Sequence, residues 1–205
     1  MSIEQQTTIN NIMLAAKTEF LEKGFRGASL RSIVKAANVT TGAFYGYYKS
    51  KEDLFEALVG KQAEKMMNTY IDAQNAFAGL PPEEQQNNMS EISGNCMEEM
   101  LDYAYDNLDE FKLILLCSEG TKYENYIHEM VEIEVDATHK FNETLRGLGI
   151  ESKLMNPQLE HMLVSGMFTA YFEMIIHEMP RKAAHEYLKD LREFYTAGWK
   201  KIMGF

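Results

Sequence analysis

Residues 29–55 read SLRSIVKAANVTTGAFYGYYKSKEDLF, and this stretch decides how the first quarter of the chain folds. Ser29 and Thr40 each precede a short, partly apolar segment. A side-chain hydroxyl at such a position can accept a hydrogen bond from the first turn of a helix. The stretch therefore predicts two short helices, 29–36 and 40–46, joined by a tight turn.

Longer helices are predicted on both sides of this pair. Apolar residues recur with helical spacing between 9 and 20, and Gly24 suits the end of that helix. Ser50, with Asp53 three residues later, has the pattern of a capping box and predicts a helix over about 50–78. A longer helix followed by two short helices and a tight turn between them is typical of a helix-turn-helix motif.

The rest of the chain is also predicted to be helical. It is rich in Glu, Met, Leu and Ala, and no alternating strand pattern persists for more than a few residues. A break is expected at 79–82, where the sequence reads GLPP. Further helices are expected at about 83–107, 109–118, 121–147, 157–178 and 181–203. The predicted fold class is all-α, with a helix-turn-helix domain at 1–47 and a helical domain at 48–205.

Charge is distributed unevenly along the 205 residues. The net charge is −11, but residues 1–51 carry +4 and the remaining 154 residues carry −15. A basic N-terminal part favours a polyanionic partner, and an acidic remainder would be repelled by DNA. Chance and ordinary solvated helix faces are the alternative explanation of the same asymmetry.

Several other classes of protein are disfavoured. Two cysteines are too few for a disulfide framework, no apolar run is long enough to span a membrane, and no signal peptide is recognisable. We therefore expect a cytoplasmic protein without membrane association. His128 and Glu132 are four residues apart but form no HExxH motif, so no metal site and no cofactor are predicted. No nucleophile motif is present either, so no enzyme activity is expected.

The second short helix has two different faces. Phe44 is the natural inward anchor, which leaves Thr40, Thr41, Gly42 and Tyr45 on the other side. Hydroxyl and backbone N–H groups at a helix N-terminus suit contact with phosphate. A glycine there lets the backbone approach a base edge closely.

These features together resemble the tetracycline repressor (TetR) family over about residues 7–59. The similarity needs no insertion or deletion, and it rests on residues in seven places along the chain, namely 15–16, 20, 24–25, 29–33, 36–39, 42–45 and 47–55. Thr41 stands where the family often has lysine, and Tyr48 stands where it usually has phenylalanine. The change at Thr41 removes one cationic contact and concerns sequence preference more than DNA binding itself.

The resemblance implies a ligand-responsive transcriptional regulator, usually a repressor, with its second short helix in the major groove. It also implies a homodimer on a palindromic operator, released by a small apolar or aromatic effector. The expected DNA-contacting residues are Ser29, Thr40, Thr41, Gly42, Tyr45, Tyr47 and Lys51.

The resemblance further implies an effector pocket and a dimer interface in the second domain. Soft methionines and aromatic residues suit an adaptable pocket, although ordinary core packing explains any single one of them. The candidates are Met100, Tyr103, Tyr123, Tyr126, Phe168 and Tyr171. The candidate interface residues on the last two helices are Met162, Gly166, Ala170, Leu191 and Phe194.

Two alternatives stay open at this point. One is a helical enzyme with an unrecognised site, against which the absence of any nucleophile–base spacing argues. A helix-turn-helix used for protein docking would not show steeply salt-dependent binding to DNA.

Overall fold

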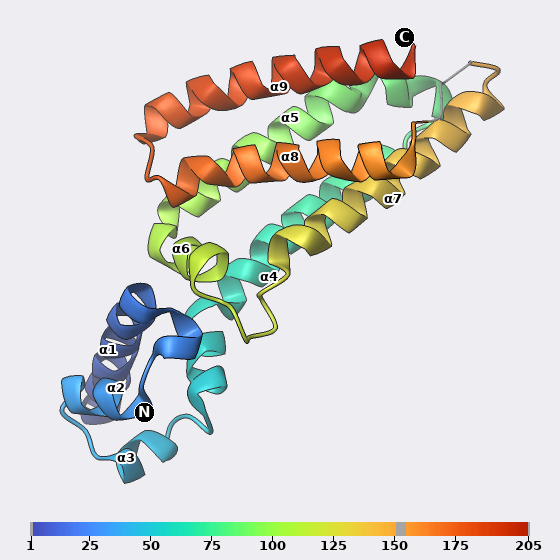
Figure 1. Ribbon diagram of the computed structural model, residues 1–205. Coiled ribbons are helices and arrows are strands. Elements are labelled where there is room, and N and C mark those ends of the chain that lie inside the picture. The colour runs from blue at the N-terminus through green and yellow to red at the C-terminus, as the bar shows by residue number, and fades with distance from the viewer. Residues whose placement is uncertain (1, 151–154, 205) are drawn as a thin grey trace. The chain divides into compact units, whose positions relative to one another are not determined.

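A computed structural model describes residues 2–150 and 155–204, and within these ranges the protein is built from nine helices without strands (Figure 1). This confirms the predicted all-α class. In chain order the helices are α1 (Ile3–Gly27), α2 (Leu30–Ala36), α3 (Thr41–Tyr45), α4 (Lys51–Ala78), α5 (Pro82–Asp106), α6 (Leu108–Leu116), α7 (Tyr126–Gly147), α8 (Pro157–Ile176) and α9 (Arg181–Met203). None of the described helices is long and apolar enough to cross a lipid bilayer.

The helices form two compact units. The N-terminal unit comprises Met1–Glu64 and Asn107–Asn125, and the C-terminal unit comprises Lys65–Asp106 and Tyr126–Phe205. Helix α4 therefore begins in one unit and ends in the other. The functional division predicted between residues 47 and 48 stays a prediction, because packing alone does not say which residues bind DNA or ligand.

Side-chain caps define the short helices of the N-terminal unit. Ser29 Oγ accepts a hydrogen bond from the backbone N–H of Ser32, and Thr40 Oγ1 accepts one from Ala43 at 3.0 Å. These bonds confirm the predicted starts of α2 and α3. Gly24 has a φ of 67° and interrupts the regular helix, as its position predicts, but helical turns continue to Gly27.

Aromatic rings form the core beneath these helices. The rings of Phe20, Phe25 and Phe55 pack with centroid separations of 5.2 to 5.8 Å. Phe44 is completely buried, and its ring packs against Tyr48, which is also buried. The predicted inward anchor of α3 is thus confirmed.

Residues 107–125 extend the N-terminal unit in a way that the sequence did not predict. The backbone N–H of Phe25 donates to Cys117 O at 2.8 Å, and Lys17 Nζ donates to Glu110 Oε1 at 2.6 Å. The helix expected to begin near residue 121 begins at Tyr126 instead. Turns occupy the intervening chain, and Gly120 takes a φ of 88° there.

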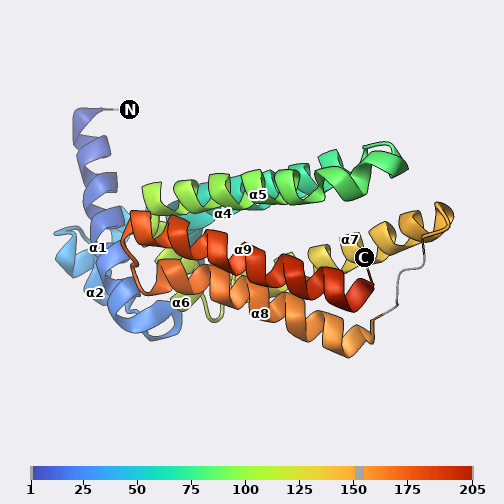
Figure 2. The ribbon, with the colours of Figure 1, turned by 90° about the horizontal axis from the view of Figure 1, so that it is seen from above.

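The C-terminal unit packs its helices around an apolar interior. Helix α7 packs against α8, α8 packs against α9, and α9 packs against α5. Figure 2 shows α9 running beside both α5 and α8. Leu101, Phe172, Ile175 and Leu188 are among the fully buried side chains that these helices share. Asn156 caps α8, and Pro157 occupies its first turn, where the missing N–H has no intrahelical partner.

Candidate functional site

Helix α3 presents an exposed polar face opposite its buried anchor. Thr41 and Gly42 are exposed, and Tyr45 is 55% exposed, whereas Phe44 is 0% exposed. The Tyr45 ring meets the Phe44 ring edge-on, with centroids 5.3 Å apart. The core therefore holds the Tyr45 side chain at the surface in a defined place, where its hydroxyl can reach a partner.

Internal packing does not require a glycine at position 42. A Cβ atom built there would meet only Thr40 Oγ1, at an ordinary contact distance of 3.9 Å. The backbone of Gly42 is helical and lies on the exposed face. The absence of a side chain therefore leaves the α3 backbone open to close approach from outside.

Ser29 and Thr40 both use their hydroxyl oxygens as helix caps. A hydroxyl that accepts one hydrogen bond still has its own hydrogen to donate, so capping is compatible with a phosphate contact. Ser29 is held further by Glu19, whose Oε1 accepts from the Ser29 backbone N–H at 3.0 Å. This bond and the neighbouring Lys23 ammonium lower the pKa of the Glu19 carboxyl. The start of α2 is thus fixed by a charged hydrogen bond from α1.

Lys51 has an internal role that the sequence did not indicate. Its ammonium donates to Phe25 O at 2.6 Å and to Ala28 O at 3.1 Å, and it lies 4.4 Å from the centroid of the Phe25 ring. The cation therefore caps the C-terminal carbonyls of α1. An ammonium has three N–H donors, so the expected phosphate contact of Lys51 stays a prediction. Tyr47, also expected at DNA, is half-buried.

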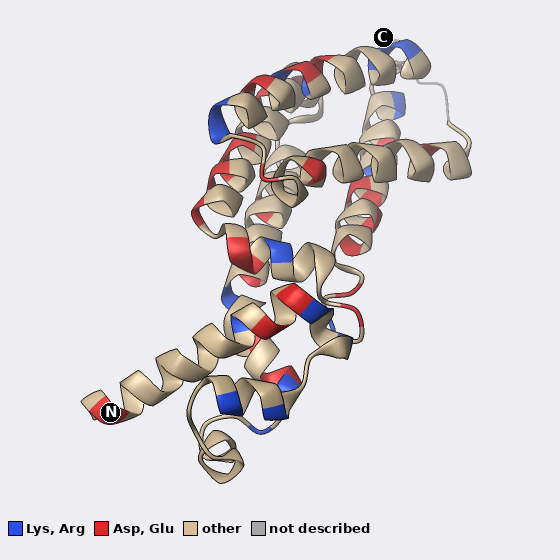
Figure 3. Cartoon of the chain, turned by 60° about the vertical axis from the view of Figure 1, so that its left-hand side comes forward, with Lys and Arg blue, Asp and Glu red and all other residues tan. Residues whose placement is uncertain are grey.

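The positive charges on α1, on α2 and between α3 and α4 fall into two groups. Lys17, Lys23 and Arg26 form ion pairs with carboxylates of the same unit. Among the residues that the structure describes, Arg31, Lys35 and Lys49 are exposed and form no ion pair. These three residues lie on α2 and directly after α3, and Figure 3 shows the lysine and arginine positions along the chain. Their charge is available to an external anion.

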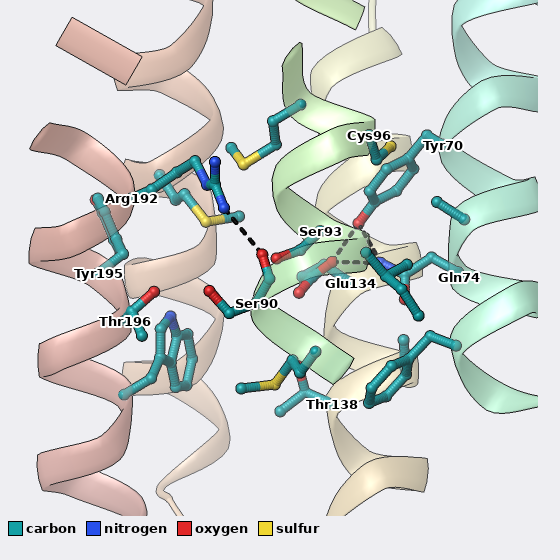
Figure 4. Close-up of a pocket in the computed structure, with 18 of the residues that line it drawn as sticks. Tyr70, Gln74, Ser90, Ser93, Cys96, Glu134, Thr138, Arg192, Tyr195 and Thr196 are labelled. Atoms are coloured by element: carbon teal, nitrogen blue, oxygen red, sulfur yellow. Dashed lines mark hydrogen bonds between the residues drawn. The ribbon is translucent and has the colours of Figure 1, made fainter. Parts of the chain in front are cut away.

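The C-terminal unit contains a cavity of about 170 Å³ lined by side chains of α4, α5, α7, α8 and α9 (Figure 4). Three of the six predicted pocket residues, Met100, Phe168 and Tyr171, line it. Tyr103 and Tyr126 lie in the same unit but not among the lining residues. Tyr123 lies in the N-terminal unit, where its hydroxyl donates to Glu56 Oε2 at 2.6 Å. These three tyrosines therefore do not line this cavity, because helical periodicity does not say which neighbour a face meets, and their part in effector binding stays a prediction.

A carboxylate faces this cavity, and the sequence reasoning missed it. Glu134 of α7 accepts hydrogen bonds from the Tyr70 hydroxyl and from Gln74 Nε2, the latter at 2.6 Å (Figure 4). Burial raises the pKa of the Glu134 carboxyl, and these two bonds partly oppose the shift. Tyr70 and Gln74, one turn apart on α4, thus hold the Glu134 carboxylate in place. Glu134 is the one acidic residue among the described residues that line the cavity.

A guanidinium lies at another wall of the cavity. Arg192 Nη2 donates to Ser90 O at 2.9 Å, and the guanidinium lies so close to Gly94 that any Cβ there would collide with it. A side chain at Gly94 would therefore force the Arg192 guanidinium to move from this position. No local sequence signal identifies this pair, because its members are 98 positions apart in the chain.

The predicted dimer residues occupy different environments. Met162 is 69% exposed and Phe194 is 73% exposed, both unusually high values for large apolar side chains. Gly166 is exposed and Ala170 is half-buried, whereas Leu191 lines the cavity. The exposed members give α8 and α9 an apolar outer surface. Their role in dimerisation stays a prediction.

Comparison with known proteins identifies the N-terminal region. Residues 12–58 match the model for bacterial regulatory proteins of the tetR family. The N-terminal region is therefore similar to the TetR family. The HTH-type transcriptional regulator UidR of Escherichia coli K12 is 34% identical over 67 residues, which are 33% of this chain and 34% of UidR. The transposon Tn10 TetC protein of Escherichia coli is 31% identical over 106 residues, which are 50% of this chain and 47% of TetC.

The likeness in fold extends further than the likeness in sequence. The chain spans about a third of UidR and about half of TetC in these matches. A TetR-like transcriptional regulator from Rhodococcus sp. RHA1 has a TM-score of 0.54 over 93% of this chain and 96% of its own, at 18% identity. That similarity shows a shared fold. The TetR resemblance inferred from residues 7–59 is therefore confirmed, and so is the helical architecture beyond it.

Proposed function

We propose that this protein is a ligand-responsive, DNA-binding transcriptional repressor of the TetR type. The observation that carries the proposal is the α3 face, where Thr41, Gly42 and Tyr45 are exposed beside the unpaired cations of α2. Small and hydroxylated groups next to positive charge suit a helix that enters the major groove and touches phosphates on both sides. The family match over the same residues supports this assignment.

Regulation requires a link between DNA and effector, and α4 supplies a covalent one. It begins at Lys51, which holds the end of α1, and it continues to Tyr70 and Gln74, which line the cavity. An effector that favours one arrangement of α4 would change the spacing of two α3 helices in a homodimer. Those helices must lie about 34–36 Å apart to enter successive major grooves of a palindromic operator. DNA then weakens effector binding by the same factor.

The cavity suits a small, mostly apolar or aromatic effector. Its walls combine aromatic and methionine side chains with two polar positions, Glu134 and Arg192. The Glu134 carboxyl, whose pKa is raised by burial, can accept a hydrogen bond from an uncharged ligand. We propose binding without chemical conversion, so the protein is not an enzyme. It acts in the cytoplasm, where bacterial DNA lies.

Selection from a pool of random DNA duplexes tests the DNA-binding function. We expect purified protein to enrich a palindromic site, and we expect the affinity to fall steeply between about 50 and 200 mM salt. Tyr45→Ala should lose the enriched site while retaining its helical circular dichroism. Failure to enrich any site at the lower salt concentration would contradict the proposal. Enrichment that is independent of salt would contradict the phosphate contacts.

A further inference from the structure

Two helices of the C-terminal unit bring three metal-binding side chains together, away from the cavity. His128 and Glu132 lie one turn apart on α7, and His161 comes from α8, which packs against it. His161 Nε2 lies 3.3 Å from Glu132 Oε1, and His128 Nε2 lies 3.9 Å from the same oxygen. The three candidate ligand atoms lie within 4.8 Å of one another.

These separations are close to those that a tetrahedral metal ion requires. Zn²⁺ binds histidine nitrogen and carboxylate oxygen at about 2.0–2.2 Å, which places neighbouring ligand atoms about 3.3–3.6 Å apart. The His161–Glu132 pair already has this separation, and metal binding would require the exposed His128 side chain to move closer to the other two. Two histidines with one glutamate, and a fourth position open to water, form an established type of zinc site.

The second nitrogen of His161 is oriented by its own helix. Ser165 Oγ lies 3.4 Å from His161 Nδ1, one turn further along α8. A hydrogen bond through Nδ1 leaves Nε2 as the nitrogen that faces Glu132. Partners of this kind fix the ring and the tautomer of a metal-binding histidine.

The other described histidines of the chain lack this arrangement. His177 pairs with Glu173 four residues away at 2.7 Å, without a second histidine nearby. His139 Nε2 contacts the buried carboxylate of Glu160. His185 contacts a different carboxylate at each ring nitrogen. The two carboxylates therefore lie on opposite sides of the ring and do not converge with one nitrogen on a common metal position. The three-residue cluster is therefore specific to the α7–α8 contact.

We propose that His128, Glu132 and His161 bind a divalent transition-metal ion of the Zn²⁺ class. Such an ion would join the first turns of α7 to α8 and would resist separation of the two helices. Protonated histidine cannot bind a metal, so the affinity should fall as the solution is acidified. The site is distinct from the effector cavity, because none of its three residues lines that cavity.

Titration of the tag-free, reduced protein with Zn²⁺ in competition with a chromophoric chelator tests the proposal. We expect one ion per chain and an increased melting temperature in the presence of Zn²⁺. Loss of a residue that only hydrogen-bonds a metal ligand typically costs about 10–100-fold in metal affinity. His128→Ala and His161→Ala remove a ligand itself, so each should cost at least that much. Co²⁺ should give the visible absorption bands of a tetrahedral centre, and these bands should be missing in both variants.

His177→Ala is the matched control, because it also removes an exposed histidine with a glutamate one turn away. It should bind Zn²⁺ as the unmodified protein does, and circular dichroism should show that all three variants remain helical. Zn²⁺ binding that persists unchanged in His128→Ala and His161→Ala would overturn the proposal. So would equal loss in His177→Ala, or no binding in the unmodified protein.

Discussion

The two units use polar side chains in different ways. In the N-terminal unit Ser29, Thr40 and Lys51 satisfy helix ends, so their contacts serve the backbone. In the C-terminal unit Glu134 and Arg192 face a cavity, so their contacts serve a space that another molecule can occupy. The N-terminal unit is thus organised to present an outer face, and the C-terminal unit to enclose an inner one.

Removal of a core aromatic ring should give the largest loss of stability. It should also show whether the two units unfold independently. Phe44→Ala deletes a fully buried ring, which typically costs about 3–5 kcal/mol. We expect loss of DNA binding and an early unfolding transition by circular dichroism. Trp199, the single tryptophan, lines the cavity and reports on the C-terminal unit through its fluorescence. Its emission in native buffer should be unchanged.

Phe172→Ala is the matched change in the other unit, where the ring is equally buried. It should alter the Trp199 emission and the effector cavity more than the N-terminal unit. If both variants shifted the Trp199 emission to the same extent, the division into two separately packed units would be wrong.

A change on the exposed α3 face should reduce function without reducing stability. Tyr45→Ala removes a side chain that is 55% exposed, so the free energy of unfolding should change little. A lost contact to a base typically costs about 1–3 kcal/mol, and operator affinity should fall by about 10–100-fold. Fluorescence anisotropy with a labelled operator measures this. Tyr45→Phe serves as the control that separates the hydroxyl from the ring.

The charge of Glu134 should make the C-terminal unit sensitive to pH. Its pKa is raised by burial, so the folded state favours the neutral carboxyl. Stability is therefore lost as the pH rises above about 4.3, the ordinary pKa of glutamate, and the loss is complete above the raised pKa. Glu134→Gln keeps an acceptor for Tyr70 and Gln74 but cannot ionise. It should melt at a higher temperature at neutral pH and should match the unmodified protein in acid.

Glu143→Gln provides the control for this experiment, because Glu143 is an exposed residue of the same helix. Thermal melts followed by circular dichroism at several pH values measure the difference between the two variants. An equal response of both would show that the cavity does not perturb Glu134. It would also show that a carboxyl facing the cavity behaves like one on the exposed face of the same helix.

A small gain in stability is expected at Gly42. Alanine fits there without a clash, and replacing a helical glycine gains about 0.5–1 kcal/mol. If the α3 backbone approaches DNA closely, Gly42→Ala should nevertheless weaken operator binding. Denaturant unfolding and operator anisotropy on the same variant measure the two effects. Unchanged operator affinity would show that the exposed glycine is not a contact point.

The parts of the fold that could be predicted depend on short separations in the chain. The caps at Ser29 and Thr40 act over three residues, and the start of α4 follows from the bond between Ser50 Oγ and the Asp53 N–H. The same local reasoning placed Phe44 inside and Tyr45 outside. It failed at residues 117–125, because the Phe25–Cys117 bond joins segments that are distant in sequence.

The sequence by itself determined the helical class, the TetR-type N-terminal region and the exposed face of α3. It did so because side chains three or four residues apart decide where helices begin and which side they bury. Only the tertiary structure decided that Lys51 caps α1, that Glu134 and Arg192 face one cavity, and that His161 meets His128 and Glu132. Those arrangements depend on which helices pack together, and periodicity along one helix carries no information about its partner.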